Sequence, residues 1–166
     1  MIVKRLTPVA LAIAAAVLAG LVPACGAYAQ TKQKSPTAAK AAVAKVNKVA
    51  IQVNENEKKT MDLALNNAKN VIDYFKSKGE QVVVEIVTYG PGLHMLRADT
   101  SPVKERIAAM SLENPNLAFA ACLNTRTNMS KAEGKEIALI SEAKTTPSGV
   151  VRLMELQGQG YAYIRP

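Results

Sequence analysis

An apolar strand, an amphipathic helix and a second apolar strand follow one another, and this succession constrains the fold more than any other feature of the sequence. The apolar runs 49–53 and 81–88 are rich in β-branched residues, which favour strands. Between them, residues 57–78 repeat apolar side chains at three- and four-residue spacing, from Met61 to Phe75. Two strands joined through a helix form a right-handed parallel crossover unit. The sequence therefore predicts an α/β domain.

The same alternation continues to the end of the chain. Pro102 opens a second predicted helix, because proline is favoured in a first turn. Residues 117–122 are apolar throughout, which is typical of a parallel strand covered on both faces. A last helix after Ser148 and a terminal strand at 161–164 complete the pattern. We expect a three-layer α/β domain with a mostly parallel sheet of four or five strands.

A third helix is predicted between residues 122 and 148 from a capping pattern. Ser130 is followed three residues later by Glu133, the spacing of a capping box. This spacing predicts a helix that begins at Ser130 and runs towards Ser141.

The first 29 residues have the layout of a secretory signal. Lys4 and Arg5 precede an apolar run at 9–22, and the small-x-small tripeptide 27–29 follows. We expect cleavage before Gln30, a periplasmic or secreted mature protein, and no integral membrane span after cleavage. Two alternatives are an uncleaved membrane anchor and lipid attachment at Cys25, because residues 22–25 loosely resemble a lipoprotein signal.

The formal net charge of +8 lies mostly outside the predicted domain. Residues 30–47 are rich in alanine and lysine and contain no acidic residue, which indicates a solvated tether. The domain itself, residues 48–166, has nearly equal numbers of basic and acidic residues. Aromatic residues make up only 4% of the chain. A nearly neutral domain with few aromatic side chains argues against a nucleic-acid partner.

Candidate functional residues follow three predicted strands, where their carboxyl ends meet. Ligands of parallel α/β sheets gather at this edge. The residues at these strand ends include one candidate catalytic residue, Cys122. The candidate ligand-binding residues are Asn54, Gly90, Gly92, His94, Asn124 and Thr125.

Two of these candidates have simpler structural interpretations. The Gly90-Pro91-Gly92 tripeptide can present backbone N–H groups to an anion, or it can be a tight turn between a strand and a helix. His94 can be an acid, a base or a metal ligand, although a single histidine is more often packed or on the surface. The sequence has no characteristic metal-ligand spacing, so we expect neither a metal nor another cofactor.

Cys122 is the most informative candidate. If the leader is cleaved, Cys25 leaves with it and Cys122 is the one thiol of the mature chain. A single cysteine in an exported protein is a reactive thiol or a partner in an intersubunit disulfide. A third interpretation is a small buried hydrophobic residue. A reactive thiol would need backbone N–H groups, a helix N-terminus or a cation nearby to form the thiolate.

Five segments, taken in order, form a recognisable set: LNNAKN at 65–70, VTYGPGL at 87–93, ACLNT at 121–125, PSGVV at 147–151 and QGQGYAYI at 157–164. Together they resemble the DsrE/DsrF-like family and specifically its exported single-domain branch. The resemblance covers nearly all of residues 48–166. In place of a histidine that relatives often have before Gly-Pro-Gly, this chain has Tyr89.

The resemblance implies a flavodoxin-like fold, assembly into homotrimers or homohexamers, and a role in sulfur metabolism. In the sulfur-relay members a cysteine near a strand end carries persulfide sulfur, and Cys122 is the matching position. Our leading hypothesis is an exported sulfur carrier, at most a sulfurtransferase-like enzyme, that works with a sulfur donor or acceptor protein. The alternative is a non-catalytic, oligomeric module for small-ligand binding or assembly.

Overall fold

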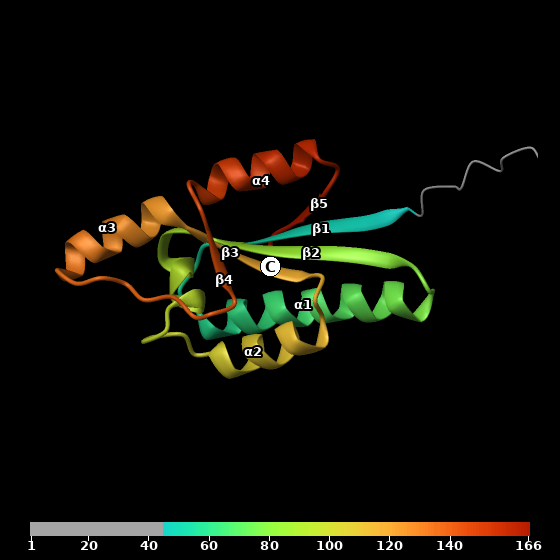
Figure 1. Ribbon diagram of the computed structural model, residues 1–166, viewed down its shortest axis with the longest axis horizontal. Helices are drawn as coiled ribbons and strands as arrows, with labels where there is room; N and C mark the ends of the chain where they lie inside the picture. The colour runs from blue at the N-terminus through green and yellow to red at the C-terminus, as the bar shows by residue number, and fades with distance from the viewer. Residues whose placement is uncertain (1–44) are drawn as a thin grey trace, which may run out of the picture. The chain divides into compact units, whose positions relative to one another are not determined.

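Five parallel strands and their connecting helices form residues 45–166, the part of the chain that the computed structural model describes (Figure 1). The predicted leader and nearly all of the predicted tether lie outside these residues. The strands are β1 (Val46–Val53), β2 (Gln81–Thr88), β3 (Leu117–Cys122), β4 (Ala143–Thr146) and β5 (Ala162–Ile164). The helices are α1 (Lys58–Ser77), the 3₁₀ helix η1 (Gly90–Leu96), α2 (Lys104–Glu113), α3 (Leu123–Glu133) and α4 (Gly149–Gly158).

The strand order determines which face of the sheet each helix covers. The order is β4-β3-β2-β1-β5, so the chain moves in one direction from β1 to β4 and then returns across the sheet to β5. Right-handed crossovers that run in opposite directions place their helices on opposite faces. Accordingly α1 and α2 lie on one face and α4 on the other (Figure 1). The predicted three-layer, flavodoxin-like α/β fold is confirmed.

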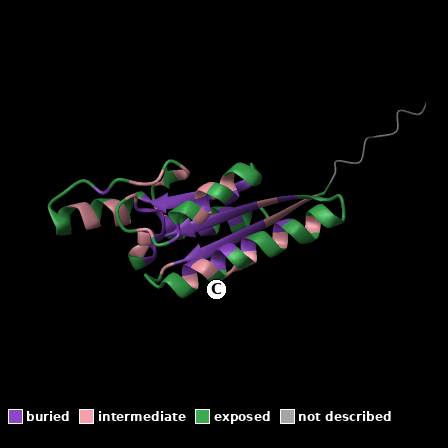
Figure 2. Cartoon of the chain, turned by 90° about the horizontal axis from the view of Figure 1, so that it is seen from below, coloured by how far each residue is buried: buried purple, intermediate pink, exposed green. Residues whose placement is uncertain are grey.

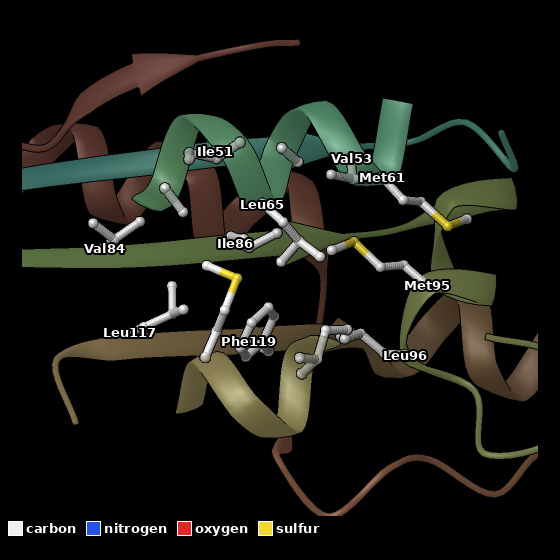
Figure 3. Close-up of a cluster of buried hydrophobic side chains, with 14 of the residues drawn as sticks. Ile51, Val53, Met61, Leu65, Val84, Ile86, Met95, Leu96, Leu117 and Phe119 are labelled. Carbon is white, nitrogen blue, oxygen red and sulfur yellow. The ribbon is translucent and has the colours of Figure 1, made fainter. Parts of the chain in front are cut away.

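The main core lies between α1, α2 and the sheet (Figure 3). Met61, Leu65 and Ile72 come from the buried stripe of α1 and pack on strand residues such as Ile51 and Phe119. Each fully buried side chain of this size contributes about 1.5–3 kcal/mol to folding. A smaller cluster fills the space under α4 and consists of Ala50, Val87, Ala120, Leu153 and Leu156.

The predicted helix at 57–78 and the strands at 81–88 and 117–122 are confirmed nearly to the residue. Strand β1 begins at Val46, so the last residues assigned to the tether belong to the sheet. The short edge strand β4 was not predicted. Its four residues, Ala143–Thr146, are all partly or fully exposed and give no apolar pattern.

The predicted start of the third helix at Ser130 was wrong. Helix α3 begins at Leu123, and Ser130 to Glu133 form its last turn instead of its first. Gly134 ends it in the left-handed conformation, with a φ of 64° that favours glycine. Within residues 45–166, no helix has the length and apolar character needed to cross a membrane.

Candidate functional site

The chain reverses direction between the carboxyl ends of β3 and β4. The connection after β3 leads outward to the edge strand, whereas the connection after β4 returns across the sheet to β5. Such a reversal is a topological switch point, the part of an open α/β sheet where ligands bind. Cys122, the last residue of β3, pairs with Thr146, the last residue of β4. The predicted cysteine therefore lies at the switch point itself.

Cys122 is held between the beginnings of two helices. It is the N-cap of α3, and its Sγ accepts a hydrogen bond from the Thr125 N–H at 3.5 Å. Side chains two residues apart on a strand share a face, so Cys122 points to the same side as Ala120, which packs under α4. The side chain is free of disulfide bonds, and the residue is only 4% exposed.

Close packing brings the first turn of α4 to this thiol. Ser148 is the N-cap of α4 and accepts a hydrogen bond from the Val151 N–H. The next residue, Gly149, lies against Tyr89, and a Cβ at this glycine would be 2.9 Å from the tyrosine Cβ. The Asn124 N–H donates to the Pro147 carbonyl at 3.4 Å and so ties the start of α3 to the chain before α4.

These contacts decide the acidity of the Cys122 thiol. Burial raises its pKa, because a charged sulfur loses hydration. Hydrogen bonds from the Thr125 side chain and backbone, and from the Gly149 and Asn124 N–H groups, act in the opposite direction and prevail. The pKa of Cys122 is therefore lowered from its ordinary value. The thiolate, the nucleophilic form, is correspondingly more populated at neutral pH.

Thr125 links the thiol to the segment after β2. Its Oγ1 accepts a hydrogen bond from the Gly90 N–H at 3.0 Å. Gly90 has a φ of 52°, a conformation that few other residues adopt. Gly92 lets the chain after β2 pack closely against the end of β1, since a Cβ at this position would lie 2.3 Å from the Val53 carbonyl oxygen. The Gly-Pro-Gly tripeptide is thus the tight turn into η1, and one of its N–H groups also orients Thr125.

The remaining predicted site residues lie around this centre. Asn54 follows β1, where its backbone packs against Gly92. The His94 Nδ1 pairs with the Thr100 hydroxyl at 2.8 Å. In the described stretch 45–166, no three His, Cys, Asp or Glu side chains converge in a way that could hold a metal ion.

The contribution of α4 to the site could not be predicted from the sequence. Ser148 was recognised as the start of a helix, but the strand β4 was not predicted, so nothing in the sequence placed Gly149 beside Cys122.

Two pockets flank the site. One, of about 370 Å³, is lined by Gly90, Pro91, Thr125, Asn128, Met129 and Ala132. The other, of about 440 Å³, runs along β3 and β4 towards Thr146 and Pro147, with Arg152 on one side.

Comparison with known proteins adds to the evidence for the fold. No family model and no curated protein matches the chain. Among solved structures, the chain is similar to a protein of unknown function, MTH1491, from Methanobacterium thermoautotrophicum. The two are 27% identical, with a TM-score of 0.61, and the match covers 72% of this chain and 99% of that chain.

Proposed function

We propose that this protein carries sulfane sulfur on Cys122. One observation supports the proposal above all others: the thiol lies at the N-termini of two helices, where hydrogen bonds lower its pKa. Partial positive charge at helix N-termini stabilises an anion, and both a thiolate and a persulfide are anions. In this proposal the same N–H groups donate hydrogen bonds to the thiolate and to the persulfide of Cys122.

The reaction is a sulfur transfer that needs no external oxidant or reductant. The Cys122 thiolate attacks the outer sulfur of a donor persulfide or polysulfide and forms a new S–S bond. The donor S–S bond breaks, and the donor leaves as a thiolate if it was a persulfide, or as a polysulfide one sulfur atom shorter. A thiolate of an acceptor protein then attacks the outer sulfur on Cys122 and takes it, which restores the Cys122 thiolate.

The setting we propose for this reaction is an oxidising, extracytoplasmic one. The leader at 1–29 is the basis, because it has the three regions of a secretory signal. A thiol that is only 4% exposed is shielded from bulky disulfides there.

Intact-mass measurement after exposure to polysulfide tests the carrier function. The full chain with Cys25→Ser should gain mass in steps of one sulfur atom, and a reducing agent should reverse the gain. A second variant with Cys122→Ser as well should gain nothing. An unmodified Cys122 chain, or equal modification of both variants, would refute the proposal.

A second candidate function is assembly without catalysis, and the outer surface of α4 favours it. Val150, Val151 and Met154 are between 50% and 66% exposed on that helix. Exposed apolar side chains that cluster on one surface are typical of a protein–protein contact surface. We propose that copies of the chain associate through α4. Assembly alone predicts that Cys122→Ser leaves the oligomeric state and the binding of any ligand unchanged.

A further inference from the structure

Helix α3 has one apolar side chain that packs against the main core, Met129, and no buried apolar stripe. No residue of Leu123–Glu133 is buried, and the helix at the left of Figure 2 accordingly shows green and pink but no purple. Its partly buried residues recur at helical spacing and are mostly polar: Thr125, Arg126, Met129 and Ser130. An isolated helix of this length is marginal in water. Other contacts must therefore fix its position.

The end of α3 far from Cys122 is held by a buried guanidinium. The Arg97 side chain is 1% exposed, and it forms two hydrogen bonds with Asp99 at 2.8 and 2.9 Å. It also forms two with Glu133, the last residue of α3, at 2.5 and 2.9 Å. A guanidinium that pairs with a carboxylate through two parallel bonds fixes both the distance and the orientation. Hydrogen bonds with Arg97 also lower the pKa of Glu133, so this carboxyl group is ionised at neutral pH.

Arg97 is itself rigidly placed. It ends η1, and its backbone forms a bridge with Leu139 in the segment that returns from α3. That segment makes the other contacts to the helix. The Arg126 Nε donates to the Ile137 carbonyl at 2.7 Å, and the Ile137 N–H donates to the Ser130 hydroxyl at 3.2 Å. Apart from Met129, the contacts that hold α3 beyond its first turn are therefore polar. At the end of the helix, Glu133 pairs with the buried Arg97 and, at 3.5 Å, with the exposed Lys135.

We propose that Arg97 is a positioning residue: through its ion pair with Glu133 it holds the first turn of α3 against the Cys122 sulfur. The inference rests on the proposed function, because it concerns the thiol that carries the sulfur. The mechanism is geometric. If α3 pivots at its far end, the Asn124 and Thr125 N–H groups move away from the sulfur, and the thiolate loses their hydrogen bonds.

A direct electrostatic effect of Glu133 predicts the opposite result. Ten residues separate Leu123 from Glu133, which corresponds to about 15 Å along an α-helix. Exposed charges at this distance are largely screened at physiological salt. Any remaining effect of removing an anion would stabilise the Cys122 thiolate and lower its pKa. Positioning predicts that the same substitution raises it.

The test replaces Glu133, because its side chain is 35% exposed and Arg97 keeps Asp99 as a partner. The full chain with Cys25→Ser is compared with the same chain carrying Glu133→Ala, and iodoacetamide alkylation is followed from pH 5 to pH 10. We expect the thiol pKa to rise and the rate at pH 7 to fall about two- to fivefold, the size of a charge interaction at a helix N-terminus. Glu133→Gln, which keeps an acceptor for Arg97, should give an intermediate rate.

Asp62→Ala is the matched control. Asp62 is similarly exposed, at 31%, and its ion pair with Arg106 lies at 3.0 Å, but it belongs to α1. This variant should lose a comparable amount of stability and keep the alkylation profile of the parent chain. An unchanged or lowered thiol pKa in folded Glu133→Ala would overturn the inference. Alkylation requires no sulfur transfer, so this result is independent of whether the persulfide forms.

Discussion

At the scale of single residues, Thr125 accounts for much of the chemistry at the site. Its backbone N–H and its hydroxyl both act on the Cys122 sulfur, and Gly90 fixes the hydroxyl through a hydrogen bond. The folded pKa of the thiol lies below its ordinary value. The thiolate interactions therefore stabilise the fold above the unfolded pKa of the thiol, and this contribution is lost as the pH falls through the folded pKa.

Thr125→Val should raise the pKa of Cys122, because valine keeps the shape of threonine but has no hydroxyl. The Gly90 N–H also loses its acceptor, which costs about 1–3 kcal/mol of stability. Alkylation rates against pH measure the first effect and thermal unfolding the second. Thr125→Ser, which retains the hydroxyl, is the control and should behave like the parent. A pKa that is the same in both variants would show that the hydroxyl does not act on the thiol.

At the scale of elements, a helix can be predicted from the sequence when it packs on the domain through an apolar stripe. A helix that packs mainly through polar contacts leaves no such pattern. Helix α1 was predicted because its buried residues recur along one apolar stripe. Helix α3 was placed wrongly because the side that faces the domain is mostly polar, with Met129 its one side chain packed on the core, so it has no such stripe. Strand β4 was missed for a related reason, since an edge strand of four partly exposed residues buries too little to leave a pattern.

Leu65→Asp tests the attachment of α1 to the sheet. Leu65 is fully buried, and an unpaired carboxylate there would have to be desolvated or protonated. We expect cooperative thermal unfolding to be lost. Leu63→Asp is the matched control on the same helix, because Leu63 is 43% exposed, and it should change stability by no more than about 0.5 kcal/mol. Cooperative melting of both variants would contradict the packing of α1 in Figure 3.

At the scale of the whole molecule, strand order brings distant segments of the chain together. Cys122 and Gly149 are brought together because β4 lies beside β3 and α4 then returns across the sheet. The same return leaves one side of α4 against the sheet and the other, with Val150, Val151 and Met154, exposed to solvent. The reversal that creates the candidate site thus also creates the proposed contact surface.

Met154→Glu should dissociate the proposed oligomer, because it places a charge at the most exposed of the three apolar side chains on α4. Light scattering coupled to size-exclusion chromatography would report the mass of each variant. Leu112→Glu is the control, since Leu112 is 87% exposed but belongs to α2 on the opposite face of the sheet. A parent chain that is already monomeric, or equal masses for the two variants, would exclude assembly through α4.

The residues alone predict the fold class, the helix α1, the strands β2 and β3, and the cysteine at the end of β3. These features depend on burial, and burial leaves a periodic apolar pattern. Two features emerge from the folded chain and not from the residues: the first turns of α3 and α4 meet at the Cys122 sulfur, and Arg97 pairs with the far end of α3. Those contacts are polar and join residues far apart in the chain, so no local pattern records them.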